Sequence, residues 1–364
     1  MASSKTVYVA TLMLMATQLC SCELRVARQA SSCDPGSQCV PLRTCPEIQS
    51  LMANPTRGNL LKIKAALCNG GIGSLKVCCD SPSTTPISPP PREENSLLPQ
   101  RCGLSASSTK VFFGEFAPLG AYPWMAVLGY RSSRTGRIEW KCGGTLINDR
   151  YVLTAAHCVV PELQLEEIRL GEHNLDTIPD CVVDAGGFQT CTPRHQTFRI
   201  TSRSQITPHP NFNTRTPVSD DIALIRLDRK ATLNLGVHPI CLPDAQFNPR
   251  AFLGNREGIV AGWGRTERGT DSNVLKRANL PFVEIEKCQP HYTVRLNDDQ
   301  VCFGGVGRRD SCNGDSGGPV FQANSQGINH LIGIVSFGND CGEDPAIYTN
   351  VASYRSWIVQ NMKP

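Results

Sequence analysis

Cysteine is the residue that most limits how this chain can fold. Of its 18 cysteines, six crowd into residues 33–79, namely Cys33, Cys39, Cys45, Cys68, Cys78 and Cys79. A unit this short rarely buries enough apolar surface to fold by itself. Three disulfides, each contributing about 2–4 kcal/mol by restricting the unfolded chain, would make up the difference. We therefore expect a small disulfide-linked domain over 33–79, and the spacing of its cysteines leaves their pairing open.

The first 22 residues have the layout of a secretory signal peptide. Lys5 precedes a mostly apolar run over 6–17, and small residues follow around Ser21. The apolar run is shorter than the roughly 20 residues that cross a bilayer. Cleavage after Cys22 would leave an even number of cysteines, whereas cleavage after Ser21 would leave one without a partner. Parity therefore favours a signal peptide over 1–22 and export to an oxidising compartment, where disulfides persist.

The charge balance gives no sign of a nucleic-acid or membrane partner. Lys and Arg together number 36, Asp and Glu together number 32, and the net charge is +4. The charged residues are interspersed rather than gathered in blocks of one sign. We therefore expect neither nucleic acid nor a membrane among the partners of this protein.

Two changes of composition follow the cysteine-rich block. Residues 80–101 are rich in proline and lack aliphatic periodicity, which is typical of an extended, exposed linker. From 111 to 364, short runs rich in Val, Ile, Leu and Thr, such as AVLGY and LIGIVSFG, alternate with turn residues. This spacing predicts an all-β domain, either a barrel or a sandwich. Within it, the C-terminal stretch VASYRSWIVQNM has helical periodicity.

Three short stretches contain residues suited to hydrolytic chemistry. TAAHCV contains His157, SDDIALIRL contains Asp221, and NGDSGGP contains Ser316. A serine hydroxyl becomes a nucleophile when a base takes its proton, and histidine is the base suited to neutral pH. A buried carboxylate can hold the imidazole in the required tautomer. The glycines beside Ser316 allow a sharp turn whose N–H groups point at a developing oxyanion.

Together these motifs make residues 111–364 resemble the chymotrypsin/trypsin family of serine endopeptidases, in which they occur in the same order. The resemblance implies two antiparallel β-barrels with a C-terminal helix. The catalytic residues that it implies are His157, Asp221 and Ser316, with oxyanion-hole N–H groups on Gly314 and Ser316. Asp220 competes for the acid role, but in the family the acid directly precedes the Ile-Ala-Leu run, which favours Asp221.

The same resemblance implies a primary specificity pocket for Arg or Lys. Its residues would be Asp310, Ser336, Gly338 and Ala346. Asp310 would supply the carboxylate at the base of the pocket, where it forms charge-assisted hydrogen bonds with the substrate side chain. Two residues depart from the family: Phe337 replaces the usual tryptophan, and Ala346 replaces the usual glycine. The methyl group of Ala346 would narrow the slot and favour Arg, unless a small backbone shift absorbs it.

Followed by a linker and a trypsin-like domain, the six-cysteine block resembles the clip domain of arthropod serine proteases. That resemblance implies the pairs Cys33–Cys78, Cys39–Cys68 and Cys45–Cys79. The resemblance to the trypsin and clip protease families further implies Cys142–Cys158, Cys288–Cys302 and Cys312–Cys341, with Cys181–Cys191 closing a loop insertion. It also implies Cys102–Cys241, which would join the segment before the trypsin-like domain to that domain. Every cysteine after Cys22 is then paired, which agrees with the parity argument.

The stretch SSTKVFFGEF, which contains Lys110, lies at the end of the linker. In the trypsin family, cleavage frees a new N-terminus whose ammonium pairs with the acid just before the catalytic serine, here Asp315. That pairing orders the oxyanion hole and the specificity pocket. The resemblance therefore implies a linker and activation segment over 80–110, cut between Lys110 and Val111 by a protease that is itself trypsin-like. The sequence VFFG departs from the family's Ile-Val-Gly-Gly, although its β-branched first residue and its glycine fit.

The loop GEHNLDTIPDC is a candidate calcium site, because trypsin-like proteases bind calcium at this position through carboxylates and carbonyls. The ligands would be the side chains of Glu172 and Asp180 and the carbonyls of Asn174 and Thr177. The alternative is a solvated acidic loop closed by its disulfide. The chemistry of hydrolysis itself is expected to need no cofactor.

The combined resemblance implies a secreted zymogen of a trypsin-like endopeptidase in an extracellular, haemolymph cascade of immunity or development. Its protein substrate would be prophenoloxidase or a cytokine-like precursor of the Toll pathway, and its partners an upstream trypsin-like protease and a serpin inhibitor. A non-catalytic homologue acting as a binding cofactor is the main alternative, but such proteins usually lose the serine that stands here as Ser316. A digestive trypsin is a further alternative. The six-cysteine block and the long linker argue against it, because a digestive enzyme needs no regulatory module.

Overall fold

The structure is a computed structural model of the 364-residue chain. It describes residues 37–41, 66–68, 76–80, 97–105, 116–183, 186–264, 270–305, 314–339 and 344–364, together with Cys33, Cys45, Ile48 and Lys62. Several expectations from the sequence fall outside the described residues: the signal peptide 1–22, Lys110, Val111, Asp310 and the pair Cys312–Cys341. The chain divides into two compact units, Met1–Arg92 and Glu93–Pro364.

The first unit contains a three-stranded antiparallel sheet in the order β1-β3-β2. Its strands are β1 (Ser37–Pro41), β2 (Leu67–Cys68) and β3 (Lys76–Asp80). Successive side chains of a strand point to opposite faces, so the adjacent Cys78 and Cys79 reach different partners. The disulfides are Cys33–Cys78, Cys39–Cys68 and Cys45–Cys79, as the clip resemblance implies.

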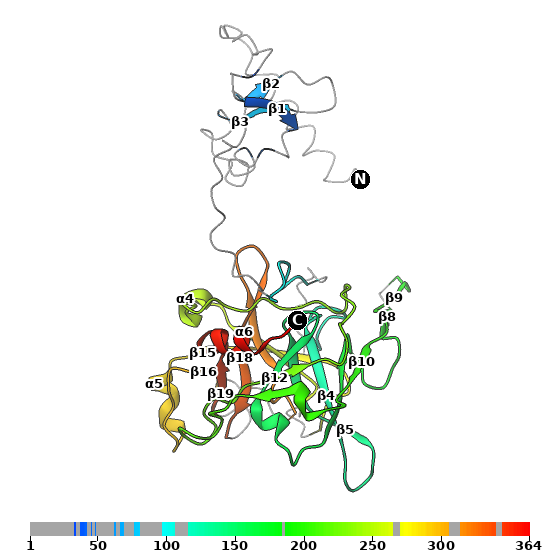
Figure 1. The fold of residues 1–364 in the computed structure, drawn as a ribbon, viewed down its shortest axis with the longest axis vertical. Coiled ribbons are helices and arrows are strands. Elements are labelled where there is room, and N and C mark those ends of the chain that lie inside the picture. The colour runs from blue at the N-terminus through cyan, green and yellow to red at the C-terminus, as the bar shows by residue number, and fades with distance from the viewer. Residues whose placement is uncertain are drawn as a thin grey trace, which may run out of the picture. The chain divides into compact units, whose positions relative to one another are not determined.

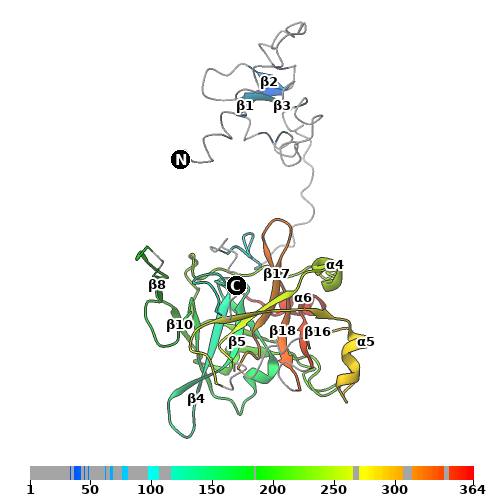
Figure 2. The ribbon, with the colours of Figure 1, turned by 180° about the vertical axis from the view of Figure 1, so that it is seen from behind.

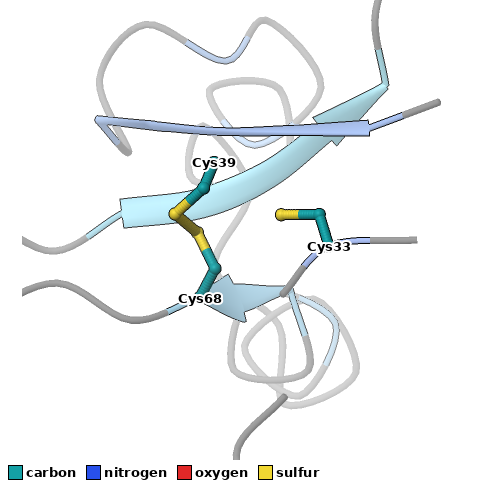
Figure 3. A group of neighbouring side chains, drawn as sticks. All are labelled: Cys33, Cys39 and Cys68. Atoms are coloured by element: carbon teal, nitrogen blue, oxygen red, sulfur yellow. A yellow bond between two sulfur atoms is a disulfide. The ribbon is translucent and has the colours of Figure 1, made fainter. Parts of the chain in front are cut away.

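The sulfur atoms of Cys33, Cys39 and Cys68 lie close enough together to resemble a metal site (Figure 3). Cys39 and Cys68 are bonded to each other, and Cys33 is bonded to Cys78. Because a metal ligand must be a free thiolate, these three cysteines form a structural cluster and leave no thiolate for an ion. The small core beside them consists of Cys45, Ile48, Val77 and Cys79.

The second unit consists of two seven-stranded antiparallel sheets (Figures 1 and 2). The first sheet has the order β10-β7-β4-β5-β6-β12-β11 and comprises β4 (Met125–Arg131), β5 (Ile138–Leu146), β6 (Tyr151–Thr154), β7 (Leu165–Leu170), β10 (Gln196–Arg199), β11 (Ile206–Pro208) and β12 (Ala223–Arg226). The second has the order β14-β13-β17-β18-β19-β16-β15 and comprises β13 (Gly258–Gly262), β14 (Lys276–Leu280), β15 (Phe282–Val283), β16 (Gln300–Gly304), β17 (Pro319–Ala323), β18 (Asn329–Phe337) and β19 (Pro345–Asn350). The expected all-β class with two curled antiparallel sheets is confirmed.

One apolar core extends over both sheets. Trp124, just before β4, is fully buried, and its ring meets that of Phe321 of β17 edge to face at 5.1 Å. Ile334 of β18 belongs to the same cluster. A fully buried side chain of this kind contributes about 1.5–3 kcal/mol. Because this core is shared, the loops of the two sheets are held in fixed positions relative to each other.

Helices are few and short in the described part of the second unit. They include α4 (Pro249–Leu253), α5 (Ile285–Cys288) and α6 (Arg355–Asn361). The expected C-terminal helix divides into a 3-10 turn, η5 (Val351–Tyr354), followed by α6, and it buries Tyr354, Ile358 and Met362. None of the helices in the described ranges has the length and apolar character needed to cross a membrane.

A disulfide-closed hairpin stands at the edge of the second unit (Figure 1). It consists of β8 (Cys181–Val183) and β9 (Gln189–Cys191), joined by the bond Cys181–Cys191. Three further disulfides described in this unit are Cys102–Cys241, Cys142–Cys158 and Cys288–Cys302. The loop insertion expected from the sequence is therefore a two-stranded ribbon.

Candidate active site

His157 and Asp221 come from neighbouring strands of the first sheet. His157 lies in η2 (Ala156–Val159), which is separated from the end of β6 by Ala155, and Asp221 is separated from the start of β12 by Ile222. Because β6 and β12 pair with Ala223 opposite Thr154, the end of one strand meets the start of the other. The disulfide Cys142–Cys158 fastens η2 to β5.

The carboxylate of Asp221 is almost completely buried and accepts three hydrogen bonds. Its Oδ2 lies 2.8 Å from His157 Nδ1, and its Oδ1 accepts the backbone N–H of His157 at 2.9 Å. The hydroxyl of Ser336 donates to Oδ2 at 2.5 Å. With Nδ1 carrying its proton toward Asp221, Nε2 is left as the basic nitrogen of the imidazole. This arrangement fits a general base held by a carboxylate.

Two opposing effects set the pKa of His157. Burial is the larger single effect and disfavours the charged imidazolium. The hydrogen bond that His157 donates to Asp221 and the negative charge of Asp221 act in the other direction and together outweigh burial, so the pKa of His157 is raised above its ordinary value. The site therefore stabilises the protonated imidazole that forms when a base has accepted a proton.

Ser316 lies in the tight turn before β17, between the two sheets. Its carbonyl accepts the N–H of Gly143 of β5 at 2.8 Å, and the N–H of Gly317 donates to Val335 of β18 at 2.9 Å. Gly317 has a φ of 77°, and a Cβ there would lie 2.2 Å from Thr154 Oγ1. Only glycine fits this position, so the turn that presents Ser316 is fixed by backbone contacts to both sheets.

His157 and Ser316 approach the site from different sheets without a hydrogen bond between their side chains among the described contacts. The Nε2 of His157 instead lies 3.6 Å from the Sγ of Cys158. Catalytic hydrogen bonds of free enzymes are often long and shorten only with substrate bound.

Asp315, the residue before Ser316, accepts the N–H of Gly264 at 3.0 Å. A Cβ on Gly262 would collide with the same carboxylate oxygen of Asp315, at 2.0 Å.

The described residues of the expected specificity pocket lie at the end of β18 and the start of β19. A Cβ on Gly338 would lie 3.5 Å from the Cβ of Ala346, so the methyl group of Ala346 faces the Gly338 backbone. The ring of Phe337 meets Tyr292 edge to face at 5.4 Å. Ser336, expected to line the substrate strand, donates its hydroxyl to Asp221.

Two supports of Asp221 could not be inferred from the sequence motifs. The hydroxyl of Thr349 in β19 donates to the carbonyl of Asp221 at 2.7 Å, over a separation of 128 residues. Arg215 binds the neighbouring Asp220, the rival candidate for the acid, through Nε and Nη2 at 2.8 and 2.7 Å. Asp220 therefore pairs with Arg215, whereas Asp221 bonds to His157.

The candidate calcium loop holds two buried carboxylates. Asp180 accepts the N–H groups of His173 and Asn174 and the hydroxyl of Thr177. Glu172 Oε2 lies 3.1 Å from both Arg169 Nη1 and His195 Nδ1. Burial raises the pKa of Glu172 to about 7; the hydrogen bond from Arg169 opposes this rise and the charge of Asp180 adds to it.

The family model described as Trypsin matches residues 111–358, so the chain belongs to the trypsin family of serine endopeptidases. More narrowly, it is a clip-domain serine protease. It is 38% identical over 370 residues to phenoloxidase-activating factor 3 of Holotrichia diomphalia, covering 97% of this chain and 99% of that protein. CLIP domain-containing serine protease B10 of Anopheles gambiae is 35% identical over 342 residues, which cover 89% and 91%.

A solved structure of the same architecture is also similar to this chain. The crystal structure of the Drosophila Grass clip serine protease of the Toll pathway matches with a TM-score of 0.62 and 33% identity. The match covers 90% of this chain and 94% of that one. The similarity therefore includes the N-terminal disulfide-linked region as well as the trypsin-like domain.

Proposed function

We propose that this protein is the secreted zymogen of a catalytically active endopeptidase in which Ser316 is the nucleophile, His157 the general base and Asp221 the acid that orients it. The observation that carries the proposal is the contact of Asp221 with both the side chain and the backbone of His157. A histidine held in this way cannot turn its ring away from the site, and its protonated form is stabilised.

The proposed reaction begins when the hydroxyl oxygen of Ser316 attacks the scissile carbonyl carbon and its proton passes to Nε2 of His157. The carbonyl oxygen becomes negatively charged and accepts the N–H groups of Gly314 and Ser316. His157 then gives its proton to the leaving amine nitrogen, the C–N bond breaks, and an ester to Ser316 remains. Water, activated by the same histidine, hydrolyses this ester. Asp221 stays charged throughout, and no step requires a cofactor.

Substrates with Arg or Lys before the scissile bond are proposed, with Arg preferred. Asp310 supplies the complementary charge in this proposal. The contact between the Ala346 methyl group and Gly338 supports a narrow slot, because the methyl group takes up space that glycine would leave open. A planar guanidinium fits such a slot and binds a carboxylate with two hydrogen bonds, which an ammonium group does not do.

Activation is proposed to occur by cleavage between Lys110 and Val111. The new ammonium of Val111 would pair with Asp315, whose carboxylate in the intact chain accepts the N–H of Gly264. That pairing would order the backbone around Gly314. The bond Cys102–Cys241 would keep the N-terminal part, with its clip domain over 33–79, attached to the trypsin-like domain over 111–364.

The names of the relatives support a place for this protein in an extracellular proteolytic cascade. One of them is named a phenoloxidase-activating factor, and another is the Grass clip serine protease of the Toll pathway. We propose that the substrate is prophenoloxidase or a cytokine-like precursor, that a trypsin-like protease cuts Lys110–Val111, and that a serpin inhibits the product. Export to the haemolymph after removal of residues 1–22 is part of the same proposal.

The experiment that tests this function starts from the purified full chain. It is cut with a lysine-specific protease and assayed on matched peptide amides ending in Arg, Lys and Phe, with Ser316→Ala as the control. We expect hydrolysis of Arg above Lys, none of Phe, and none by the control. A chain that is cut at Lys110 and hydrolyses none of these peptides is the non-catalytic homologue instead. Hydrolysis mainly after Phe would exclude the role of Asp310.

Calcium binding in the 172–180 loop is the one cofactor proposal. The donor set supports the proposal, because two buried carboxylates face one loop. Burial, and to a smaller extent the charge of Asp180, raise the pKa of Glu172, and a bound cation would favour its charged form. Glu172 and Asp180 would hold the ion, with the carbonyls of Asn174 and Thr177. A rise in melting temperature with calcium over EGTA, lost in Glu172→Gln, is the expected result. No rise would mean that Arg169 alone serves as the cation of the loop.

A further inference from the structure

The segment that leads into Asp221, residues 209–220, has an unusual backbone. We call it the strap; it connects β11 to β12. Within the described residues, every non-glycine residue with a positive φ lies in it: Asn213 at 61°, Val218 at 57° and Asp220 at 55°. Such angles are rare outside glycine, and for a β-branched residue such as Val218 they are strained. Contacts elsewhere must therefore hold the strap in place.

Asp220 provides the main contact of the strap. Its side chain is 4% exposed, and it forms a bidentate ion pair with Arg215. Its Oδ1 also accepts the hydroxyl of Tyr354 at 3.0 Å, and the ring of His209 lies nearby with Nδ1 at 3.6 Å. Burial acts to raise the pKa of Asp220, but the hydrogen bond from Arg215 and the other polar contacts outweigh it and lower the pKa. Asp220 is therefore a buried carboxylate that depends on one arginine for its charge balance.

The same arginine reaches the second sheet. Nη2 of Arg215 donates to Oδ2 of Asp299 at 2.7 Å, and Asp299 lies directly before β16. The carbonyl of Asp299 accepts the N–H of Asn350, at the end of β19. Arg215 thus connects the strap of the first sheet to the end of two strands of the second.

These contacts close a ring that begins and ends at the catalytic acid. Thr349, the neighbour of Asn350, donates its hydroxyl to the carbonyl of Asp221. From Asp221 the ring runs through Thr349, Asn350, Asp299, Arg215 and Asp220, and then returns to Asp221 through the peptide bond. A closed ring resists displacement better than a single contact, because moving Asp221 would break contacts on both sides of it.

We propose that Arg215 is a positioning residue for Asp221. It fastens the strained strap to the second sheet and neutralises Asp220, so that Asp221 keeps its position under His157. Arg215 touches neither His157 nor Ser336 in the described contacts, so it acts only through Asp220 and Asp299. The inference rests on the catalytic roles proposed above for His157 and Asp221.

The kinetic test uses the full chain after activation at Lys110–Val111, with rates expressed per titrated active site. Arg215→Gln is expected to lower kcat by about tenfold or more while KM stays within about twofold, since a displaced catalytic group affects the transition state rather than binding. Asp299→Asn removes only the link to the second sheet and should lower kcat by less. Arg203→Gln, an exposed arginine of η3 (Arg203–Gln205), is the matched control and should match the wild type.

A second measurement needs no catalysis and therefore separates this inference from the proposed function. In a Ser316→Ala chain, the low-field proton resonance of the His157 Nδ1–H bonded to Asp221 is recorded by NMR. We expect Arg215→Gln to shift or broaden it and Arg203→Gln to leave it unchanged. If Arg215→Gln fails to fold, Asp299→Asn is expected to shift the same resonance to a smaller extent. An unmoved resonance with unchanged kcat, or a loss confined to KM, would overturn the role of Arg215.

Discussion

The buried carboxyl group of Glu172 should make the protein less stable as the pH rises toward neutrality. Its side chain is fully buried, and its pKa is raised from 4.5 to about 7, mainly by burial. A carboxyl with a raised pKa binds more protons in the folded state than in the unfolded state between these two pH values. The free energy of unfolding therefore falls as the pH rises through that window and is constant again above it.

The size of the effect follows from the shift. Each pKa unit corresponds to about 1.4 kcal/mol, so a rise from 4.5 to about 7 corresponds to a loss of about 3 kcal/mol. Glu172→Gln has nearly the same shape but cannot ionise. We expect the variant and the wild type to be similar in stability near pH 4.5, and the variant to be more stable by up to about 3 kcal/mol at pH 7.5.

The assay is urea unfolding of the disulfide-intact chain in EGTA, so that no divalent cation contributes. The two proteins are compared at several pH values from 4.5 to 7.5, which cancels the titration of groups that they share. Glu286→Gln, which removes an exposed carboxyl from α5, serves as the control and should show no pH-dependent difference. A constant difference between Glu172→Gln and the wild type over the whole range would refute the argument from burial.

Two further predictions concern the neighbourhood of the proposed nucleophile and acid. Ser336→Ala removes a hydrogen bond from the buried Asp221 carboxylate and should lower kcat by about tenfold in the peptide assay; an unchanged kcat would show that the other donors suffice. Gly317→Ala places a Cβ 2.2 Å from Thr154 Oγ1 and should cost more than about 3 kcal/mol in unfolding. Gly327→Ala, with a φ of 79° but no atom within 4 Å of the added Cβ, should cost only about 1–2 kcal/mol. Equal losses at the two glycines would contradict the steric argument.

The sequence predicted the architecture because its strongest signals are local. Short β runs separated by turn residues indicated an all-β domain, and the helical spacing of the C-terminal stretch located η5 and α6. The division into two sheets came from the resemblance to the trypsin family. The motif containing Ser316 already carried the glycine whose conformation the turn requires. The disulfide pairing was beyond spacing alone and came from the resemblance to the clip and trypsin families.

Long-range contacts around Asp221 were not predictable from the motifs. Thr349 and Ser336 lie in distant strands, and nothing in their local sequence marks them as partners of Asp221, the proposed catalytic acid. From the sequence, Asp220 was only a second candidate for the acid role of Asp221. Its pairing with Arg215 could not be predicted, because Arg215 is half-exposed and has the same local character as other surface arginines. The pairing of Glu172 with Arg169 and His195 was missed for the same reason: the sequence shows the acids of a loop but not the cations that fold against it.

The most direct test of the central claim is the rate of Arg-peptide hydrolysis by the chain before and after cleavage at Lys110–Val111. We expect little activity in the intact chain, strong activity after cleavage, and none in Ser316→Ala cut in the same way. Full activity in the intact chain, or equal activity in the Ser316→Ala variant, would contradict it.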